Sequence, residues 1–147
     1  MSDSLDVKAL LDPEIAAAIE GLDLGFSTLS NETLPNVRAM WAALPRPEVS
    51  DKVARTDHVI PQRPAVSVRA HRDKSASGDL PCIYWIHGGG PVVGSNVGDD
   101  PRFDKWCPAL KCAGVSVEYG LAPESQYPGP LEDCYAGLAW LHANAGS

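Results

Sequence analysis

The residues best suited to chemistry are His87, Gly88, Gly89 and Gly90, which follow directly on the apolar segment Cys82–Ile86. Glycine weakens regular structure, so three in a row after a strand indicate unusual backbone torsions or a closely approaching ligand. Such a loop can direct successive N–H groups into one small space, where they stabilise the oxyanion that forms on a substrate carbonyl. The alternatives are a plain glycine turn and a phosphate-binding loop. Neither a Gly-Lys-Ser/Thr sequence of the Walker type nor a GxGxxG pattern is present to support the phosphate loop.

The segments around this loop predict parallel α/β architecture. The segment 82–86 is apolar on both faces, which is typical of a strand inside a parallel sheet, and 115–119 has the same pattern. Asp100 and Pro101 should cap a helix at about 102–112. A further helix should open at Pro130, and its shared face carries Leu131, Tyr135, Leu138 and His142. The order strand, helix, strand, helix favours parallel α/β units.

The first half of the chain predicts helices followed by a β-hairpin. Asp12 and Pro13 can start a helix over 12–22, with Ile15, Ile19 and Leu22 on one face, and a second helix is expected over 35–44, with Val37, Trp41 and Leu44 facing one way. Beyond it, residues 53–60 and the alternating segment 66–71 should form antiparallel strands. In the second of these, Val66, Val68 and Ala70 alternate with Ser67, Arg69 and His71. We therefore expect residues 1–50 to form cap helices and residues 51–147 to form a partial α/β core.

Three segments resemble the hormone-sensitive-lipase-like esterases of the α/β-hydrolase superfamily. Residues 83–90, IYWIHGGG, resemble the HGGG oxyanion loop of that family. Residues 117–124, VEYGLAPE, look like its DYRLAPE segment, and residues 127–136, YPGPLEDCYA, are similar to the helix start that follows. The chain is thereby identified as the N-terminal part of an α/β-hydrolase fold that lacks the C-terminal half.

The resemblance implies roles for the glycine loop. The backbone N–H groups of Gly88 and Gly89 would form most of the oxyanion hole, Gly90 would let the loop turn, and His87 would shape the loop by hydrogen bonds rather than act as a base. The implied substrate is a small carboxylic ester, with no metal or organic cofactor. Pro91 and Gly120 depart from the family pattern, and we expect the latter to loosen its turn.

The serine, acid and histidine of the family's catalytic triad are not found in this sequence. Catalysis in the family needs a serine on a GxSxG turn, and the three nearest candidates, Ser27, Ser95 and Ser116, all lack that pattern. His58, His71 and His142 have ordinary places on strand or helix surfaces. We therefore expect an ester-hydrolase fragment that is inactive alone. The alternatives are a non-catalytic half-domain that binds a partner chain, and a gene product without a role.

Net charge and cysteine spacing limit the kinds of partner and ligand that we expect this chain to bind. A net charge of −7 disfavours nucleic acid, and the N-terminal residues contain no signal peptide or membrane span, so the chain reads as cytoplasmic. The four cysteines are best explained as reduced, buried thiols, because no CxxC pair supports the alternative of a zinc site. In the family sheet, strand 82–86 would also pair with a later strand. Here we expect it to be an open edge, prone to self-association or to pairing with a complementing chain.

Overall fold

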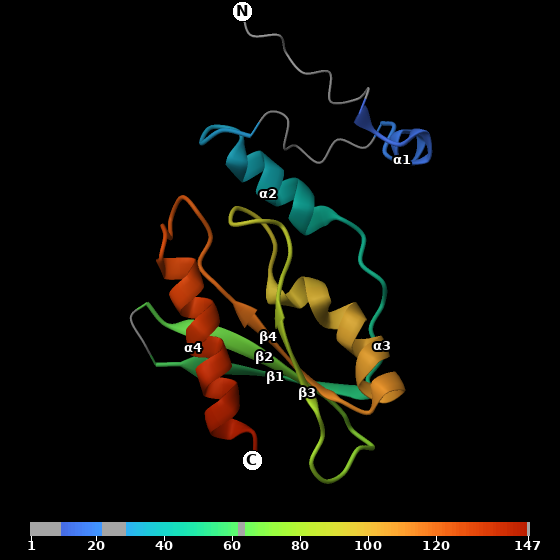
Figure 1. The fold of residues 1–147 in the computed structure, drawn as a ribbon, viewed down its shortest axis with the longest axis vertical. Coiled ribbons are helices and arrows are strands. Elements are labelled where there is room, and N and C mark those ends of the chain that lie inside the picture. Colours follow the sequence, from blue (N-terminus) through green and yellow to red (C-terminus); the bar gives the residue numbers. More distant parts are fainter. Residues whose placement is uncertain (1–9, 22–28, 62–63, 147) are drawn as a thin grey trace, which may run out of the picture.

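A computed structural model describes residues 10–21, 29–61 and 64–146. It contains one mixed sheet of four strands in the order β1-β2-β4-β3 (Figure 1). The strands are β1 (Val53–Ile60), β2 (Val66–Asp73), β3 (Cys82–Ile86) and β4 (Ala113–Glu118). The predicted hairpin is confirmed, since β1 and β2 are antiparallel, and the predicted parallel unit is confirmed in the pairing of β3 with β4. β2 pairs with β4 in the antiparallel sense, which joins the two halves of the sheet.

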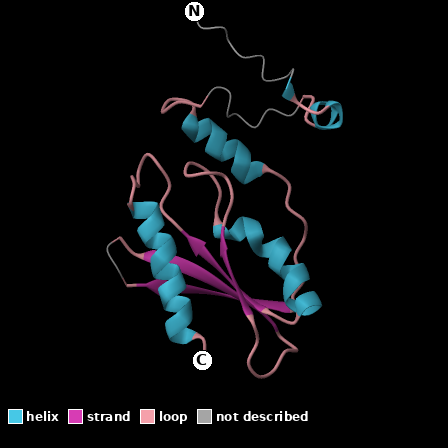
Figure 2. Ribbon diagram, in the orientation of Figure 1, coloured by secondary structure: helices cyan, strands magenta, loops and turns pink. Residues whose placement is uncertain are grey.

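Helices cover both faces of this sheet (Figure 2). α3 (Asp100–Leu110) follows a short 3-10 helix, η3 (Asn96–Asp99), and α4 (Gly129–Asn144) closes the chain. Because successive strand residues point to opposite faces, Tyr84 packs in the cluster on the α4 side, whereas Ile83 and Trp85 pack with Phe103 of α3. The two clusters are therefore separate cores on opposite faces of one sheet.

The core on the α4 side is made of valines from β2 and β4. Val66, Val68, Val115 and Val117 are buried, and Cys134, Trp140 and Leu141 of α4 pack against them. The residues of α4 that pack on the sheet are therefore not the ones whose shared face the sequence pattern pointed out. Leu131, Tyr135 and Leu138 share a face as expected, but they are 60%, 72% and 47% exposed.

The face of β2 that we expected to be polar and solvated is covered by α3. His71 is only 1% exposed and stacks on Phe103, with 4.4 Å between the ring centroids. The expectation that His71 occupies a surface place is therefore wrong. Room for Phe103 comes from Gly114 of β4, where a Cβ atom would collide with the phenyl ring.

The first N-terminal helix is shorter than expected, and the second has the expected length but is shifted by one residue. α1 (Pro13–Ala18) begins as predicted, with the Asp12 carboxylate accepting a hydrogen bond from the Glu14 N–H, but Ile15 and Ile19 are exposed and Leu22 lies outside the described residues. α2 (Leu34–Ala43) starts one residue early, with Pro35 in its first turn. The division into a cap at 1–50 and a core at 51–147 stays a prediction.

Candidate oxyanion site

The glycine loop begins where β3 ends, at the carboxyl edge of the parallel strands. Gly89 and Gly90 have φ values of +112° and +61°, a region that residues with a Cβ rarely adopt. A Cβ on Gly89 would also collide with the Val93 carbonyl, and one on Gly94 would collide with the Gly88 carbonyl. Glycine is therefore required at 89 and 94 by both torsion and space, which is why the sequence carries it there.

His87 is built into the protein beneath this loop. Its ring is 4% exposed and stacks on Tyr119, with centroids 4.1 Å apart and planes 12° apart. The Nδ1 atom lies 3.0 Å from the Gly88 carbonyl oxygen, so Nδ1 carries the proton and donates it there. The Tyr119 hydroxyl lies 3.0 Å from the His87 carbonyl oxygen and 3.1 Å from that of Gly90, within reach of both acceptors. These contacts fix the loop from below.

The N–H groups of Gly88 and Gly89 are left without a protein acceptor in the part of the chain that the structure describes. Both residues line an open cavity of about 710 Å³ between the loop, the end of α2 and the start of α3. Unpaired backbone donors facing a cavity are what an incoming carbonyl oxygen requires. The wall of this cavity is mostly apolar on the α2 side and includes Trp41, Leu44, Pro45 and Pro47.

Arg38 of α2 holds this helix against the loops. Its guanidinium donates two hydrogen bonds to the Glu124 carboxylate, at 2.7 and 2.8 Å, and one each to the carbonyl oxygens of Val92 and Ala122. Leu34 and Val37 of the same helix pack on Val93. Four bonds from one side chain therefore join three segments that surround the cavity.

The VEYGLAPE segment is held by two further carboxylates. Glu118 accepts a hydrogen bond of 2.6 Å from the Asn96 N–H, and Asp133 accepts one of 2.9 Å from the Gly120 N–H. A Cβ on Gly120 would lie 2.7 Å from that of Ser125, so the glycine allows a close approach. The expectation that Gly120 loosens this turn is therefore wrong.

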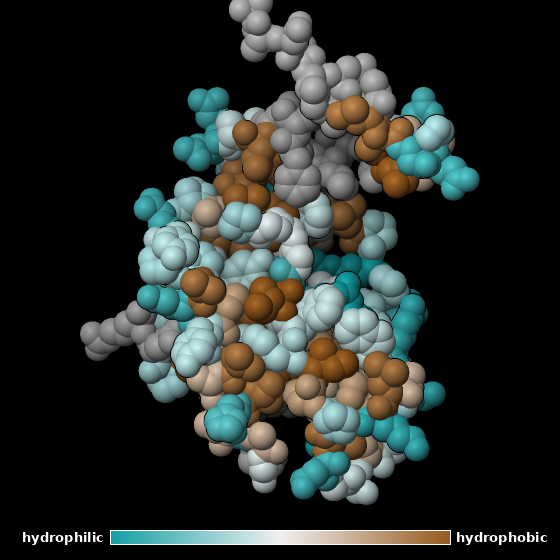
Figure 3. All heavy atoms as spheres, viewed as in Figure 1, coloured by the Kyte–Doolittle hydropathy of each residue, from teal (hydrophilic) through white to brown (hydrophobic). Residues whose placement is uncertain are grey.

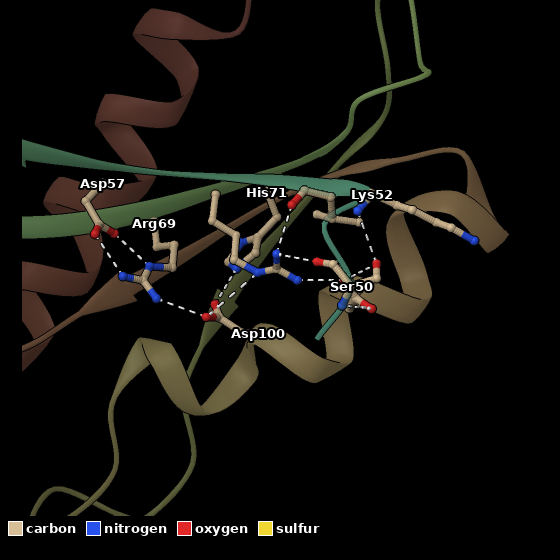
Figure 4. Close-up of polar contacts among 9 residues, drawn as sticks. Ser50, Lys52, Asp57, Arg69, His71 and Asp100 are labelled. Atoms are coloured by element: carbon tan, nitrogen blue, oxygen red, sulfur yellow. Dashed lines mark hydrogen bonds and ion pairs between the residues drawn. The ribbon is translucent and has the colours of Figure 1, made fainter. Parts of the chain in front are cut away.

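Asp100 does not cap α3 as the sequence indicated. Its carboxylate turns toward the sheet, where it lies 2.9 Å from the His71 Nε2 and 3.0 Å from the Arg69 guanidinium (Figure 4). Arg55 approaches it at 3.8 Å and pairs with Asp104 at 2.6 Å. Leaving a buried charge unpaired costs several kcal/mol, which is more than the loss of a helix cap costs. The Asp100 carboxylate therefore pairs with the two arginines instead of capping α3. This network is structural and lies on the α3 side of the sheet.

The sequence did not single out several polar residues of the cavity wall. Arg46, Asp99 and Arg102 line the cavity beside the glycines. Asp99 is 6% exposed, and burial raises the pKa of its carboxyl above the usual range. The only available signal was the Pro45-Arg46-Pro47 run, which marks a stiff segment at the end of α2.

All four cysteines are unpaired thiols. Cys107 and Cys112 are buried as expected, and burial raises the pKa of Cys107 to about 12. Cys82 is exposed, because β3 is an edge strand, so the expectation of burial is wrong for that residue. Among the residues described, no three His, Cys, Asp or Glu side chains are grouped to hold a metal ion.

Comparison with known proteins places this geometry in a class. Residues 83–147 match the family model described as the α/β-hydrolase fold. A solved structure titled bacterial heroin esterase superposes with a TM-score of 0.76 at 36% identity, covering 95% of this chain and 45% of that one. The chain thus has a partial α/β-hydrolase fold.

Curated relatives narrow the class. Carboxylic ester hydrolase LipN of Mycobacterium tuberculosis is 34% identical over 111 residues, which are 75% of this chain and 29% of the relative. Hormone-sensitive lipase of Bos taurus is 32% identical over 69 residues, which are 47% of this chain and 9% of the lipase. The chain is accordingly similar to part of the hormone-sensitive-lipase-like esterases of the α/β-hydrolase fold, and it spans less than half the length of these relatives. No helix among the residues described is long and apolar enough to cross a membrane.

Proposed function

We propose that this chain supplies the oxyanion-binding half of a carboxylic ester hydrolase and does not turn over esters by itself. The observation that carries the proposal is the pair of N–H groups at Gly88 and Gly89, which have no acceptor among the described residues and border the cavity. An ester carbonyl placed there would gain two hydrogen bonds as its oxygen becomes negative. One donor of an oxyanion hole contributes about 3–4 kcal/mol to lowering the barrier.

His87 and Gly90 shape the loop in this proposal and take no part in proton transfer. The stacking of His87 on Tyr119 and its bond to the Gly88 carbonyl support that role, because a ring held in this way cannot swing toward a nucleophile. Serine, acid and base would come from residues beyond these 147, since no GxSxG occurs in them. The substrate would be a small ester and no cofactor is needed. The unpaired thiols fit the predicted cytoplasmic location.

A complementation assay tests this function. The chain would be co-expressed with the C-terminal part of LipN that it does not match, and hydrolysis of p-nitrophenyl butyrate would be followed. We expect no turnover above buffer from either part alone, turnover from the pair, and loss of that turnover with Gly89→Ala. Gly146→Ala, where an added Cβ meets nothing within 4 Å, is the matched control. Turnover by the chain alone that Gly89→Ala abolishes would contradict the claim of inactivity, and an associated but inactive pair would contradict the oxyanion role.

A second candidate function is a non-catalytic half-domain that binds a partner chain through its open sheet edge. The specific observation is β3, which pairs only with β4 among the described strands and exposes Cys82 and 50% of Ile86. Hydrophobic residues also form patches on the face of the molecule shown in Figure 3. On α4, the side chains of Leu131 and Leu138 are 60% and 47% exposed. An unpaired apolar strand edge is a template for another strand.

Edge pairing can be tested with two lysine substitutions. We expect the chain alone to self-associate in light scattering after size exclusion, and Ile86→Lys to shift it toward monomer. Val59→Lys is the control, because Val59 is 68% exposed on the opposite edge strand. A monodisperse wild-type monomer whose β3 amides are protected from hydrogen exchange would eliminate this alternative.

A further inference from the structure

We propose that the cavity beside the glycine loop selects esters that carry a carboxylate, and that Arg46 is the residue that recognises it. This inference deepens the proposed ester-binding function and rests on it. The observation behind it is a concentration of positive charge in one cavity of a chain whose net charge is −7. Arg38, Arg46 and Arg102 line that cavity, against a single acid, Asp99.

The three arginines are not equivalent. The Arg38 guanidinium is already hydrogen-bonded to the Glu124 carboxylate and to two backbone carbonyl oxygens, so few of its N–H groups remain to bind a ligand. Arg102 lies with its guanidinium 4.2 Å above the Trp85 ring and 3.7 Å from Asp99. Its charge is therefore shared between a ring and an acid. Neither residue is the main anchor for an anion.

Arg46 differs from both because no carboxylate of the described residues forms an ion pair with it. It stands between Pro45 and Pro47, and each proline ring fixes its own φ and restricts the residue before it. The backbone that carries Arg46 is therefore stiff, and little backbone freedom is lost when this residue binds a ligand. All three residues of this run line the cavity.

The opposing charge of Asp99 is weakened by its surroundings. Its carboxyl is buried, and the Arg102 guanidinium 3.7 Å away offsets its negative charge, which reduces its repulsion of a neighbouring anion. The remaining lining is apolar along α2, where Trp41 and Leu44 can contact the carbon chain of a ligand. An ester held at Gly88 and Gly89 by its carbonyl, with its chain against α2, would place a terminal carboxylate toward Arg46. Monoesters of dicarboxylic acids have this composition.

A pair of probes of nearly equal size isolates the charge. Monobenzyl succinate carries the carboxylate, and benzyl levulinate replaces it with a neutral methyl ketone. Binding of each to the 147-residue chain would be measured by titration calorimetry at low salt. We expect the anionic probe to bind about three- to tenfold tighter, which is the range for an exposed but well-oriented Arg–carboxylate pair. The preference should shrink in 1 M salt because exposed charges are screened.

Arg46→Gln should remove the preference and leave binding of the neutral probe unchanged. Arg72→Gln is the control, since Arg72 is exposed, bonds to the Gly78 carbonyl and does not line this cavity. Equal binding of both probes to the unsubstituted chain would overturn the carboxylate inference while leaving the ester cavity intact. Loss of both probes in Arg46→Gln would also overturn it, because Arg46 would then be structural. Failure of both probes to bind the unsubstituted chain would instead contradict the proposed function.

Discussion

Arg38 of α2 and Glu124 of the segment after β4 form a two-point ion pair across 86 positions of sequence, with both guanidinium nitrogens within 2.8 Å of a carboxylate oxygen. The pair lies at the rim of the cavity, and Arg38 also binds the carbonyl oxygens of Val92 and Ala122. α2 is thereby fixed over the glycine loop by a planar, multiply bonded cation. Lysine could not replace it, because an ammonium lacks the forked geometry.

Removing Arg38 should release α2 from the loops. We expect Arg38→Ala to destabilise the fold by about 1–2 kcal/mol, since two carbonyls lose a charged donor. Amide hydrogen exchange should rise in α2 and at Val92 and Val93, while β2 and β4 stay protected. Unchanged exchange in α2 would show that the packing of Leu34 and Val37 holds the helix without the ion pair.

The same pair predicts an acid-dependent loosening of α2. The hydrogen bonds from Arg38 lower the pKa of Glu124 to about 2 from its ordinary value of 4.5. A carboxylate whose pKa is lower in the folded state stabilises fully above the unfolded value and progressively less as the pH falls toward the folded value. The protection of the α2 amides, taken relative to the intrinsic exchange rate at each pH, should therefore fall between pH 4.5 and 2. Glu124→Gln should remove that pH dependence, and Glu132→Gln on exposed α4 should leave it in place.

Two neighbouring glycines should respond differently to alanine. Gly89→Ala forces a positive φ on a residue with a Cβ and drives that atom into Val93, so we expect a loss of more than 1 kcal/mol in chemical unfolding. Gly88→Ala meets nothing within 4 Å and its φ is not in the left-handed region, so it should cost much less. Equal destabilisation by the two variants would mean that the loop torsions assigned here are incorrect.

The Asp100 network should be far more sensitive than its exposed neighbour Asp57. Asp100→Asn removes this carboxylate from Arg69, Arg55 and His71, although Arg69 keeps Asp57 and Arg55 keeps Asp104, and we expect a cost of about 2–3 kcal/mol. Asp57→Asn removes the other carboxylate partner of Arg69. Because the Asp57 side chain is 58% exposed, this substitution should cost no more than about 1 kcal/mol. Urea unfolding of both variants measures the difference. Similar costs would mean that α3 does not shield this network.

His71 should make stability fall in mild acid. Burial lowers the pKa of His71 below its ordinary value of 6.5, and the attraction of Asp100 opposes that shift only in part. The unfolded chain then binds the proton more readily than the folded one, so stability is complete above pH 6.5 and declines as the pH falls through the folded pKa. An NMR titration should place the His71 pKa below 6.5. A His71 pKa above 6.5 would reverse the sign and contradict this account.

The strands were predictable because their signals are local. Val66 and Val68 alternate with polar residues, and Cys82–Ile86 is a short apolar run, so each pattern is complete within a few residues. The alternating pattern of β2 ends at His71, yet the strand extends to Asp73. Pairing with β1, which continues to Asp73, extends the strand beyond its own pattern.

The surroundings of β2 were not predictable in the same way. Ser67, Arg69 and His71 read as a solvated face, yet α3 covers that face and buries His71. Nothing near position 71 indicates this, because the covering residues are Asp100 and Phe103, about thirty positions later. Local sequence predicts that Asp100 caps α3. Its carboxylate binds Arg69 and His71 instead, and these residues are distant in the sequence.

By itself, the sequence determined the strand segments, the glycine run with its unusual backbone torsions, and the resemblance to a family of known fold. These depend on torsional preference and on side-chain periodicity, which act between residues close in the chain. Only the tertiary structure decided which strand faces are covered, which apolar face of α4 stays exposed, and which arginines surround the cavity. Those contacts join residues tens of positions apart, and they arise only after sheet order and helix packing bring the segments together.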